Sequence, residues 1–253
     1  MPSNKDIVLE FTHSGLEKWD AAVVNRVMKP DVIQHNPQAT GGRQGLLEMF
    51  KVLPEPMQYQ VWRVLEDGDL VVVHGTVKLI GQTFAVFDVY RLENRQIAEH
   101  WDSLQPLPSA PNPSGRSMLD GPTTISNLDQ TEANKALIQR FYQQIFVGGH
   151  FDQIGAYFDG NTYLQHNPGV ADGLSSLLNA SAAAAKAGKG LKVDTVSRIL
   201  GEGNFVYVRS GGEFGGQRVV FSDLYRIQNG KIAEHWDVIQ PVPAESPNLN
   251  GML

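Results

Sequence analysis

The sequence predicts an α+β protein made of two similar domains, each with helices packed on one face of a curved antiparallel sheet. The first observation is that two strings occur twice, Gln-His-Asn-Pro at Gln34–Pro37 and Gln165–Pro168, and Ile-Ala-Glu-His-Trp-Asp at Ile97–Asp102 and Ile232–Asp237. The second is that each copy places helical patterns before a run of strand patterns. The spacing of 131 residues between the Gln-His-Asn-Pro strings indicates duplicated domains, because solenoid repeats span only about 20–50 residues.

The domain boundaries follow from similar tails after each copy. Asn112–Leu119 (NPSGRSML) resembles Asn248–Leu253 (NLNGML), so we assign each tail to the copy that precedes it. This gives a first domain over residues 1–119, a turn-rich connection over 120–130 and a second domain over 131–253.

The helices are clearest in the second copy. After the cap-forming residues Asp129–Glu132 comes a helix with apolar residues at amphipathic spacing, ended by Gly148-Gly149; the apolar positions are Leu137, Ile138, Phe141, Tyr142, Ile145 and Phe146. A short helix near Phe151–Phe158 and an extended segment at Tyr163–His166 should follow. A third helix is predicted over Leu174–Ala187.

Four strands complete the second copy: Lys192–Gly201, Asn204–Gly211, Gln217–Ile227 and Lys231–Gln240. Asn229-Gly230 is a strong hairpin signal between the last two. The glycines at 211–212 and 215–216 flank Glu213-Phe214, which favours a hairpin over a phosphate-binding loop. The first copy repeats this order, with Glu93-Asn94-Arg95 at the last turn.

Composition narrows the class of protein. The 253 residues are 42% hydrophobic, carry a net charge of −6 and include no cysteine, which excludes disulfides and thiolate chemistry. The chain has no basic cluster, no signal-like start and no long apolar run, so we expect a cytoplasmic protein that does not bind nucleic acid or membranes.

The repeated strings, the Asp-Xaa-Tyr-Arg motif that precedes each second string (Asp88–Arg91, Asp223–Arg226) and the Asn/Gly/Met tails together resemble the SnoaL-like group of the NTF2-like superfamily. This group includes polyketide cyclases. The resemblance implies a cone-shaped domain with helices on the concave side of its sheet, around a deep pocket. It also implies that Asp102 and Asp237 match the acid/base aspartate of the cyclases, while Asp88 and Asp223 stand where the cyclases usually have a histidine.

Strand alternation divides the second string into two faces. His100 and Asp102 should share one face, Glu99 and Trp101 the other, and the equivalent residues of the second copy should do the same. If Asp102 points into a pocket, Trp101 points outward. We therefore expect the tryptophans of the two copies to be buried against each other in an intramolecular pseudodimer, so that the chain functions as a monomer.

These residues predict a cofactor-independent acid/base enzyme, a cyclase, isomerase or aldol-type lyase, acting on a small to medium hydrophobic carbonyl compound. The candidate catalytic residues are Asp102, His100, Asp88, Asp237, His235 and Asp223. The candidate substrate-binding residues are His35, Asn36, Tyr90, His166, Asn167 and Tyr225.

Other interpretations remain open from the residues alone. The same pocket would serve a non-catalytic binding protein, and the polar strand residues would also serve a structural network in an assembly module. Gln-His-Asn-Pro equally fits a turn that caps backbone groups. His35, His100 and Asp102 imitate a two-histidine, one-carboxylate metal site, but nothing in the sequence brings His35 near the others, so we expect no metal.

Overall fold

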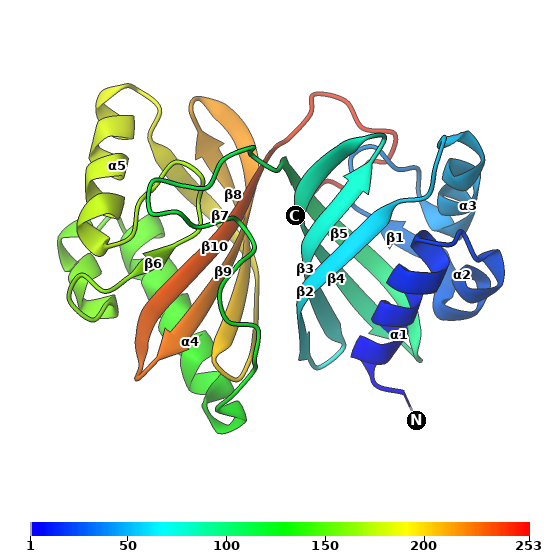
Figure 1. Ribbon diagram of the computed structural model, residues 1–253, viewed down its shortest axis with the longest axis horizontal. Coiled ribbons are helices and arrows are strands. Elements are labelled where there is room, and N and C mark those ends of the chain that lie inside the picture. Colours follow the sequence, from blue (N-terminus) through cyan, green and yellow to red (C-terminus); the bar gives the residue numbers. More distant parts are fainter. Residues whose placement is uncertain (1) are drawn as a thin grey trace. The chain divides into compact units, whose positions relative to one another are not determined.

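The computed structural model describes residues 2–253 and divides the chain into two compact units (Figure 1). Unit 1 contains the residues up to Leu107 together with Val242–Leu253, and unit 2 contains Pro108–Pro241. Each unit holds one five-stranded sheet and its own helices. The predicted α+β class and the duplication are therefore confirmed.

The helices of unit 1 are α1 (Asn4–Glu10), which continues into the π-helical segment η1 (Phe11–Leu16), then α2 (Ala21–Val27) and α3 (Gly42–Val52). Those of unit 2 are the 3-10 turn η2 (Leu128–Gln130), α4 (Thr131–Phe141) with the π-helical segment η3 (Tyr142–Val147), the 3-10 helix η4 (Phe151–Tyr157) and α5 (Leu174–Lys186). Both copies widen their first helix into a π-helical turn at the same place. Such turns are frequent at functional sites.

The strands of unit 1 are β1 (Met28–Gln34), β2 (Gln58–Asp67), β3 (Leu70–Leu79), β4 (Gln82–Glu93) and β5 (Gln96–Pro106). Those of unit 2 are β6 (Leu164–Gln165), β7 (Leu191–Glu202), β8 (Phe205–Phe214), β9 (Gln217–Gln228) and β10 (Lys231–Pro241). The four predicted strands of the second copy are thus present, with ends shifted by a few residues.

We predicted purely antiparallel sheets, but both sheets are mixed. Their orders are β1-β5-β4-β3-β2 and β6-β10-β9-β8-β7. Strands β2 to β5 and β7 to β10 form antiparallel ladders, whereas β1 pairs parallel with β5 and β6 pairs parallel with β10. Parallel neighbours need a long crossover connection, so this pairing depends on contacts distant in sequence. It places each Gln-His-Asn-Pro string beside the Glu-His-Trp-Asp strand.

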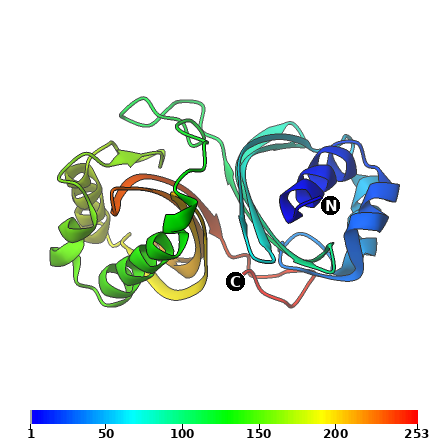
Figure 2. The same ribbon diagram turned by 90° about the horizontal axis from the view of Figure 1, so that it is seen from below.

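Each unit has its own hydrophobic core between helices and sheet. In unit 1 the ring of Phe11 meets Tyr90 edge to face at 5.8 Å, and in unit 2 Phe141 meets Tyr225 at 6.0 Å. Seen from below, each sheet curves around its helices (Figure 2), as the resemblance implied. The sheet face that carries Tyr90 and Tyr225 is therefore the concave one.

The hairpin turns follow their sequence signals. Asn229 and Gly230 both have positive φ (51° and 69°), as do Gly215 and Gly216 (61° and 79°), so both pairs form tight hairpin turns. The phosphate-loop interpretation is excluded at Gly215-Gly216. The first copy makes the last turn with Asn94 and Arg95, and Arg95 adopts φ 66°, which costs energy for a residue with a Cβ.

The tails correct the predicted domain boundaries. We assigned 1–119 to the first domain and 131–253 to the second, each with its own tail. In the structure the first tail, residues 108–120, belongs to unit 2, and the second tail, residues 242–253, belongs to unit 1. The similarity of the two tails predicts that they make equivalent contacts, but it does not show which copy each tail contacts. Those contacts join segments that are far apart in the chain.

None of the helices in residues 2–253 combines the length and apolar character needed to span a bilayer.

Candidate functional site

Two aspartates face each other across the last hairpin of each sheet. Asp88 of β4 is the register partner of Asp102 of β5, and Asp223 of β9 is the partner of Asp237 of β10. The four residues are 2–9% exposed. Their alternation with Tyr90 and Tyr225 places them on the concave face, as predicted. Each unit therefore buries a pair of carboxyl groups on the inner face of its sheet.

A histidine binds one member of each pair. His100 Nε2 lies 3.0 Å from Asp88 Oδ1, and His235 Nε2 lies 2.8 Å from Asp223 Oδ1. Each imidazole also stacks on the tyrosine opposite it, with centroids 4.7 Å apart for Tyr90 and His100 and for Tyr225 and His235. The predicted grouping of aspartate, histidine and tyrosine is thus present in both units.

The glutamine of Gln-His-Asn-Pro decides the protonation of this histidine. Gln165 Oε1 accepts the backbone N–H groups of His166 and Asn167, both at 2.9 Å, so this atom is the amide oxygen. His235 Nδ1, 3.0 Å from the same oxygen, must therefore carry a hydrogen and donate. Because Nε2 faces a carboxylate, the His235–Asp223 pair shares one further proton. His100 has the same relationship to Gln34, at 2.9 Å.

The asparagine of each string binds the second aspartate. Asn36 Nδ2 donates to Asp102 Oδ2, and Asn167 Nδ2 donates to Asp237 Oδ2 at 2.6 Å. The asparagine Oδ1 atoms accept the backbone N–H groups of Gln38 and Gly169. Gln-His-Asn-Pro therefore both caps its own turn and presents an amide donor to the carboxylate.

Electrostatics distinguish the members of the unit 2 cluster. Burial raises the pKa of Asp237, and the charge of Asp223 raises it further. Burial alone would lower the pKa of His235, but the hydrogen bond and charge of Asp223 outweigh it, so that pKa is raised. Among the described residues, Asp237 Oδ1 has no hydrogen-bond partner. Asp237 thus has a raised pKa and lies near a histidine whose pKa is also raised.

The two units place different tyrosines around their carboxylates. In unit 2 Tyr142, the first residue of η3, donates to Asp223 Oδ2 at 2.8 Å and lies 3.0 Å from the hydroxyl of Tyr225. Tyr163 accepts a hydrogen bond from Gln165. Aligning the two first helices places Thr12 where unit 2 has Tyr142, and in unit 1 Tyr59 of β2 is the tyrosine near Asp88 and Asp102. From the sequence we did not assign Tyr59, Tyr142, Tyr163 or the glutamines to the site, although Gln34 and Gln165 belong to the repeated string.

A cavity of about 420 Å³ lies between α4 and β7 of unit 2. Its polar walls include Lys135, Gln139 and Arg198, and Tyr142 is one of its lining residues. Asp223 and Asp237 are not among them. Tyr142 is therefore a lining residue of this cavity whose hydroxyl also binds Asp223.

Comparison with known families finds a match in each half of the chain. The SnoaL-like domain family matches residues 8–100, and the SnoaL-like polyketide cyclase family matches residues 136–246. The chain is a tandem SnoaL-like protein.

Similar solved structures each match about one domain of the tandem SnoaL-like protein. An NTF2-like protein of unknown function from Cytophaga hutchinsonii is 20% identical, with 42% of this chain and 93% of that chain covered and a TM-score of 0.38. IdmH, a candidate polyketide cyclase from Streptomyces antibioticus, is 18% identical (41% and 93% covered, TM-score 0.35). A candidate ketosteroid isomerase from Kribbella flavida is 16% identical (48% and 87% covered, TM-score 0.38). No curated protein matches the chain.

The histidines of the Gln-His-Asn-Pro strings do not lie beside the aspartate pairs, where we expected His35 and His166 as substrate-binding residues. His35 stacks on Trp101 at 4.6 Å, and His166 stacks on Trp236 at the same distance. Because neighbouring residues of an extended segment point to opposite faces, His35 and Asn36 cannot both face Asp102. In the tandem SnoaL-like protein the asparagine takes the inner face and the histidine the outer one.

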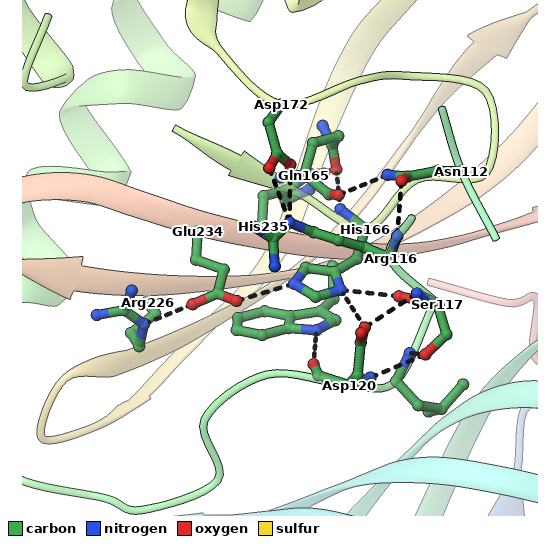
Figure 3. Close-up of polar contacts among 12 residues, drawn as sticks. Asn112, Arg116, Ser117, Asp120, Gln165, His166, Asp172, Arg226, Glu234 and His235 are labelled. Atoms are coloured by element: carbon green, nitrogen blue, oxygen red, sulfur yellow. Dashed lines mark hydrogen bonds and ion pairs between the residues drawn. The ribbon is translucent and has the colours of Figure 1, made fainter. Parts of the chain in front are cut away.

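The outer face of unit 2 carries a separate ion-pair network (Figure 3). Glu234 binds His166 Nε2 at 2.8 Å and Arg226 Nε at 2.7 Å. Burial opposes ionisation of Glu234, but the hydrogen bonds of His166 and Arg226 outweigh it and lower the pKa of Glu234. Unit 1 repeats this network with Glu99, His35 and Arg91. The predicted outward side of the Glu-His-Trp-Asp string is therefore a charged cluster.

The metal pattern considered from the sequence does not form, because His35 lies on the outer face. Another trio, Asp88, His100 and Asp102, has ligand atoms within 4.8 Å of one another. Its histidine, however, directs Nε2 at Asp88 and Nδ1 at Gln34 in hydrogen bonds, and a metal-bound imidazole nitrogen must offer a lone pair. In this arrangement both imidazole nitrogens of His100 are engaged in hydrogen bonds.

Proposed function

We propose that the tandem SnoaL-like protein is a cofactor-independent acid/base enzyme that moves protons next to the carbonyl group of a small to medium hydrophobic compound. Asp102 and Asp237 are the proton-transferring residues. The observation that carries the proposal is the carboxylate pair of each unit, which is buried and bound by a histidine in both copies.

The chemistry follows from the raised pKa of Asp237. A carboxyl with a raised pKa is a stronger base in its ionised form than an exposed aspartate. Ionised Asp237 removes a proton from the carbon next to the carbonyl, and the electrons of the broken C–H bond form an enolate. The protonated carboxyl then returns the proton to another carbon in an isomerisation. In an aldol closure the enolate attacks a second carbonyl, and the proton goes to the new alkoxide.

Hydrogen-bond donors stabilise the enolate oxygen. Burial raises the pKa of Tyr142 well above its ordinary value, with the charge of Asp223 adding to the effect, so its hydroxyl keeps its proton and donates. Tyr142 is one of the lining residues of the cavity of unit 2, and in this proposal the substrate carbonyl replaces Asp223 as the acceptor of its hydroxyl. Asn167 holds Asp237 in the orientation needed for proton transfer.

Deuterium exchange provides a test that needs no knowledge of the natural substrate. The probe is 2-tetralone, an apolar bicyclic ketone whose α-protons exchange with D2O through an enolate, followed by NMR. We expect the wild-type protein to accelerate the exchange and Asp102→Asn with Asp237→Asn to lower the rate by about 10²–10⁴-fold. Both substitutions keep side-chain shape. Full exchange activity in the folded double variant would overturn the mechanism.

A non-catalytic binding protein is the second candidate, favoured by the cavity in unit 2. The probe 2-naphthol distinguishes these two functions. It is a planar analogue of the enol of 2-tetralone, and its fluorescence reports binding. The enzyme binds 2-naphthol and exchanges 2-tetralone. A binding protein binds 2-naphthol, also in the double variant, and leaves the ketone protons unchanged.

The proposal includes a chain that works as a monomer, with its two copies taking the place of two subunits. Light scattering should then give a mass close to 27.9 kDa. A mass of two or more chains would contradict this part.

A further inference from the structure

The two tails make buried polar contacts that involve none of the proposed catalytic residues. Asn112 of the first tail is 4% exposed, and Asn248 of the second tail is 9% exposed. Asn112 Nδ2 lies 2.7 Å from the carbonyl of Gln165, 3.4 Å from that of Asn167 and 3.0 Å from that of Val170. One side-chain amide thus binds the whole turn that carries Asn167.

The second tail binds the equivalent turn of unit 1. Asn248 Nδ2 donates to the carbonyls of Asn36 and Ala39 at 2.8 and 2.9 Å, and Asn250 Nδ2 donates to the carbonyl of Gln34 at 2.9 Å. Buried carbonyls left without such donors are costly. The turn that carries Asn36 therefore depends on the second tail for its conformation.

The tails also hold the histidine of each string. The carbonyl of Gly251 accepts from His35 Nδ1 at 2.7 Å, and the carbonyl of Ser117 accepts from His166 Nδ1 at 2.7 Å. In unit 2, Arg116 adds an ion pair with Asp172 at 2.9 Å, and Asp172 in turn accepts the backbone N–H of Gln165 (Figure 3). A tail thus holds both the backbone carbonyls and the histidine side chain of each Gln-His-Asn-Pro string.

Each tail follows one copy in the sequence but contacts the Gln-His-Asn-Pro string of the other copy. Strand β5, which carries Asp102, runs into the first tail, and that tail belongs to unit 2 with Asp237. Strand β10, which carries Asp237, runs into the second tail, which belongs to unit 1 with Asp102. We propose that each tail is a positioning segment for the catalytic aspartate of the other copy, acting through the asparagine of the Gln-His-Asn-Pro string. The catalytic role of the aspartate rests on the proposed function, whereas the positioning of the Gln-His-Asn-Pro string by the tail does not.

Two matched substitutions test the crossing in the full-length chain. Asn112→Asp keeps the side-chain oxygen that accepts from Ser114 and Arg116, but it replaces the amide donor with an oxygen that faces carbonyls. Asn248→Asp does the same at the second tail, where the oxygen accepts from Asn250. Leu249→Ala is the control in the same tail, because Leu249 is 100% exposed.

Hydrogen–deuterium exchange read by mass spectrometry reports the positioning without any activity. Asn248→Asp should speed backbone exchange in peptides covering 34–41 by about tenfold or more and leave 165–172 unchanged. Asn112→Asp should do the reverse, and Leu249→Ala should change neither. The proposal would be overturned if a substitution in a tail sped up exchange in the string of the copy that the tail follows in sequence, or in neither string. If either variant does not fold, Arg116→Gln and Asn250→Ala replace it.

Turnover then tests the link to catalysis. In an Asp237→Asn background, where only Asp102 remains, Asn248→Asp should lower kcat for 2-tetralone exchange about tenfold with little change in KM, and Asn112→Asp should have no effect. In an Asp102→Asn background the two effects should be exchanged. An uncrossed pattern would overturn the proposal. A wild-type protein without exchange activity would instead remove the proposed function, and the backbone-exchange result would still decide the positioning.

Discussion

Asp223 and Asp237 lie directly opposite each other in β9 and β10, yet they have different partners. Asp223 accepts hydrogen bonds from Tyr142 and His235, whereas Asp237 has Asn167 on one oxygen. Within one register pair, Asp223 therefore has two side-chain donors, whereas Asp237 has one donor and a pKa that burial raises. Part of this pattern recurs in unit 1, where His100 binds Asp88 and Asn36 binds Asp102.

Asp237→Asn should stabilise the protein at neutral pH. Because the pKa of Asp237 is raised in the folded state, chiefly by burial, its contribution to stability is full below its ordinary pKa and is lost as pH rises through the raised value. Asparagine cannot ionise, so the free energy of unfolding should rise by about 1–3 kcal/mol at pH 7, and the gain should shrink in acid. Urea unfolding at several pH values measures this. Asp223→Asn is the matched control and should destabilise, because it weakens the bonds to Tyr142 and His235.

Glu234→Gln should destabilise the protein by about 3 kcal/mol at neutral pH, because it leaves Arg226 and His166 without their buried anion. The lowered pKa of Glu234 means that its contribution is present above the ordinary glutamate pKa and is lost as pH falls through the lowered value. The difference between variant and wild type should therefore disappear in acid. Glu99→Gln should cost less, since the Glu99 side chain is 16% exposed and that of Glu234 is 0% exposed. Equal losses would contradict this reasoning.

Tyr142→Phe should lower stability by about 1–2 kcal/mol, because the buried carboxylate of Asp223 loses a donor. It should also slow 2-tetralone exchange in an Asp102→Asn background, where only Asp237 acts. In an Asp237→Asn background the rate should not change, since unit 1 has Thr12 at the equivalent position. A rate loss in both backgrounds would show that Tyr142 acts through overall stability.

Arg95→Gly should stabilise the protein by about 1 kcal/mol, because Arg95 adopts φ 66° and glycine reaches this conformation without steric cost. Asn229-Gly230 already provides the favourable turn at the equivalent place. Gly230→Ala, at φ 69°, should lose a similar amount. Thermal unfolding of the two variants checks the pair, and a neutral Arg95→Gly would mean that other contacts of Arg95 offset the strain.

The helices, the strands and the hairpin turns were predictable because their signals are local. Apolar spacing predicted α4, and Asn229-Gly230 predicted the β9–β10 turn. The pleat of a strand also gave the two faces of the Glu-His-Trp-Asp string correctly, since alternation needs no knowledge of neighbours. The candidate catalytic residues were grouped by the same rule, and the structure brings them together.

His35 and His166 were expected beside the aspartate pairs because residues i and i+1 were treated as one site. Which of His35 and Asn36 faces Asp102 depends on how β1 pairs with β5, and no local signal specifies a parallel partner across a crossover. Tyr142 was interpreted only as an apolar position of a helix. Its hydroxyl matters because folding brings it to Asp223, which is 81 positions away.

By itself the sequence determined that the fold is built twice, where its elements lie, and which side chains of each strand share a face. These properties depend on repetition and on periodicity within a few residues. Only the tertiary structure decided that β1 and β6 run parallel to their neighbours, that asparagine and not histidine meets the aspartate, and that the tails are exchanged. Those features depend on hydrogen bonds such as that between His35 and Gly251, which are 216 positions apart, and such pairings are selected by burial in the complete fold.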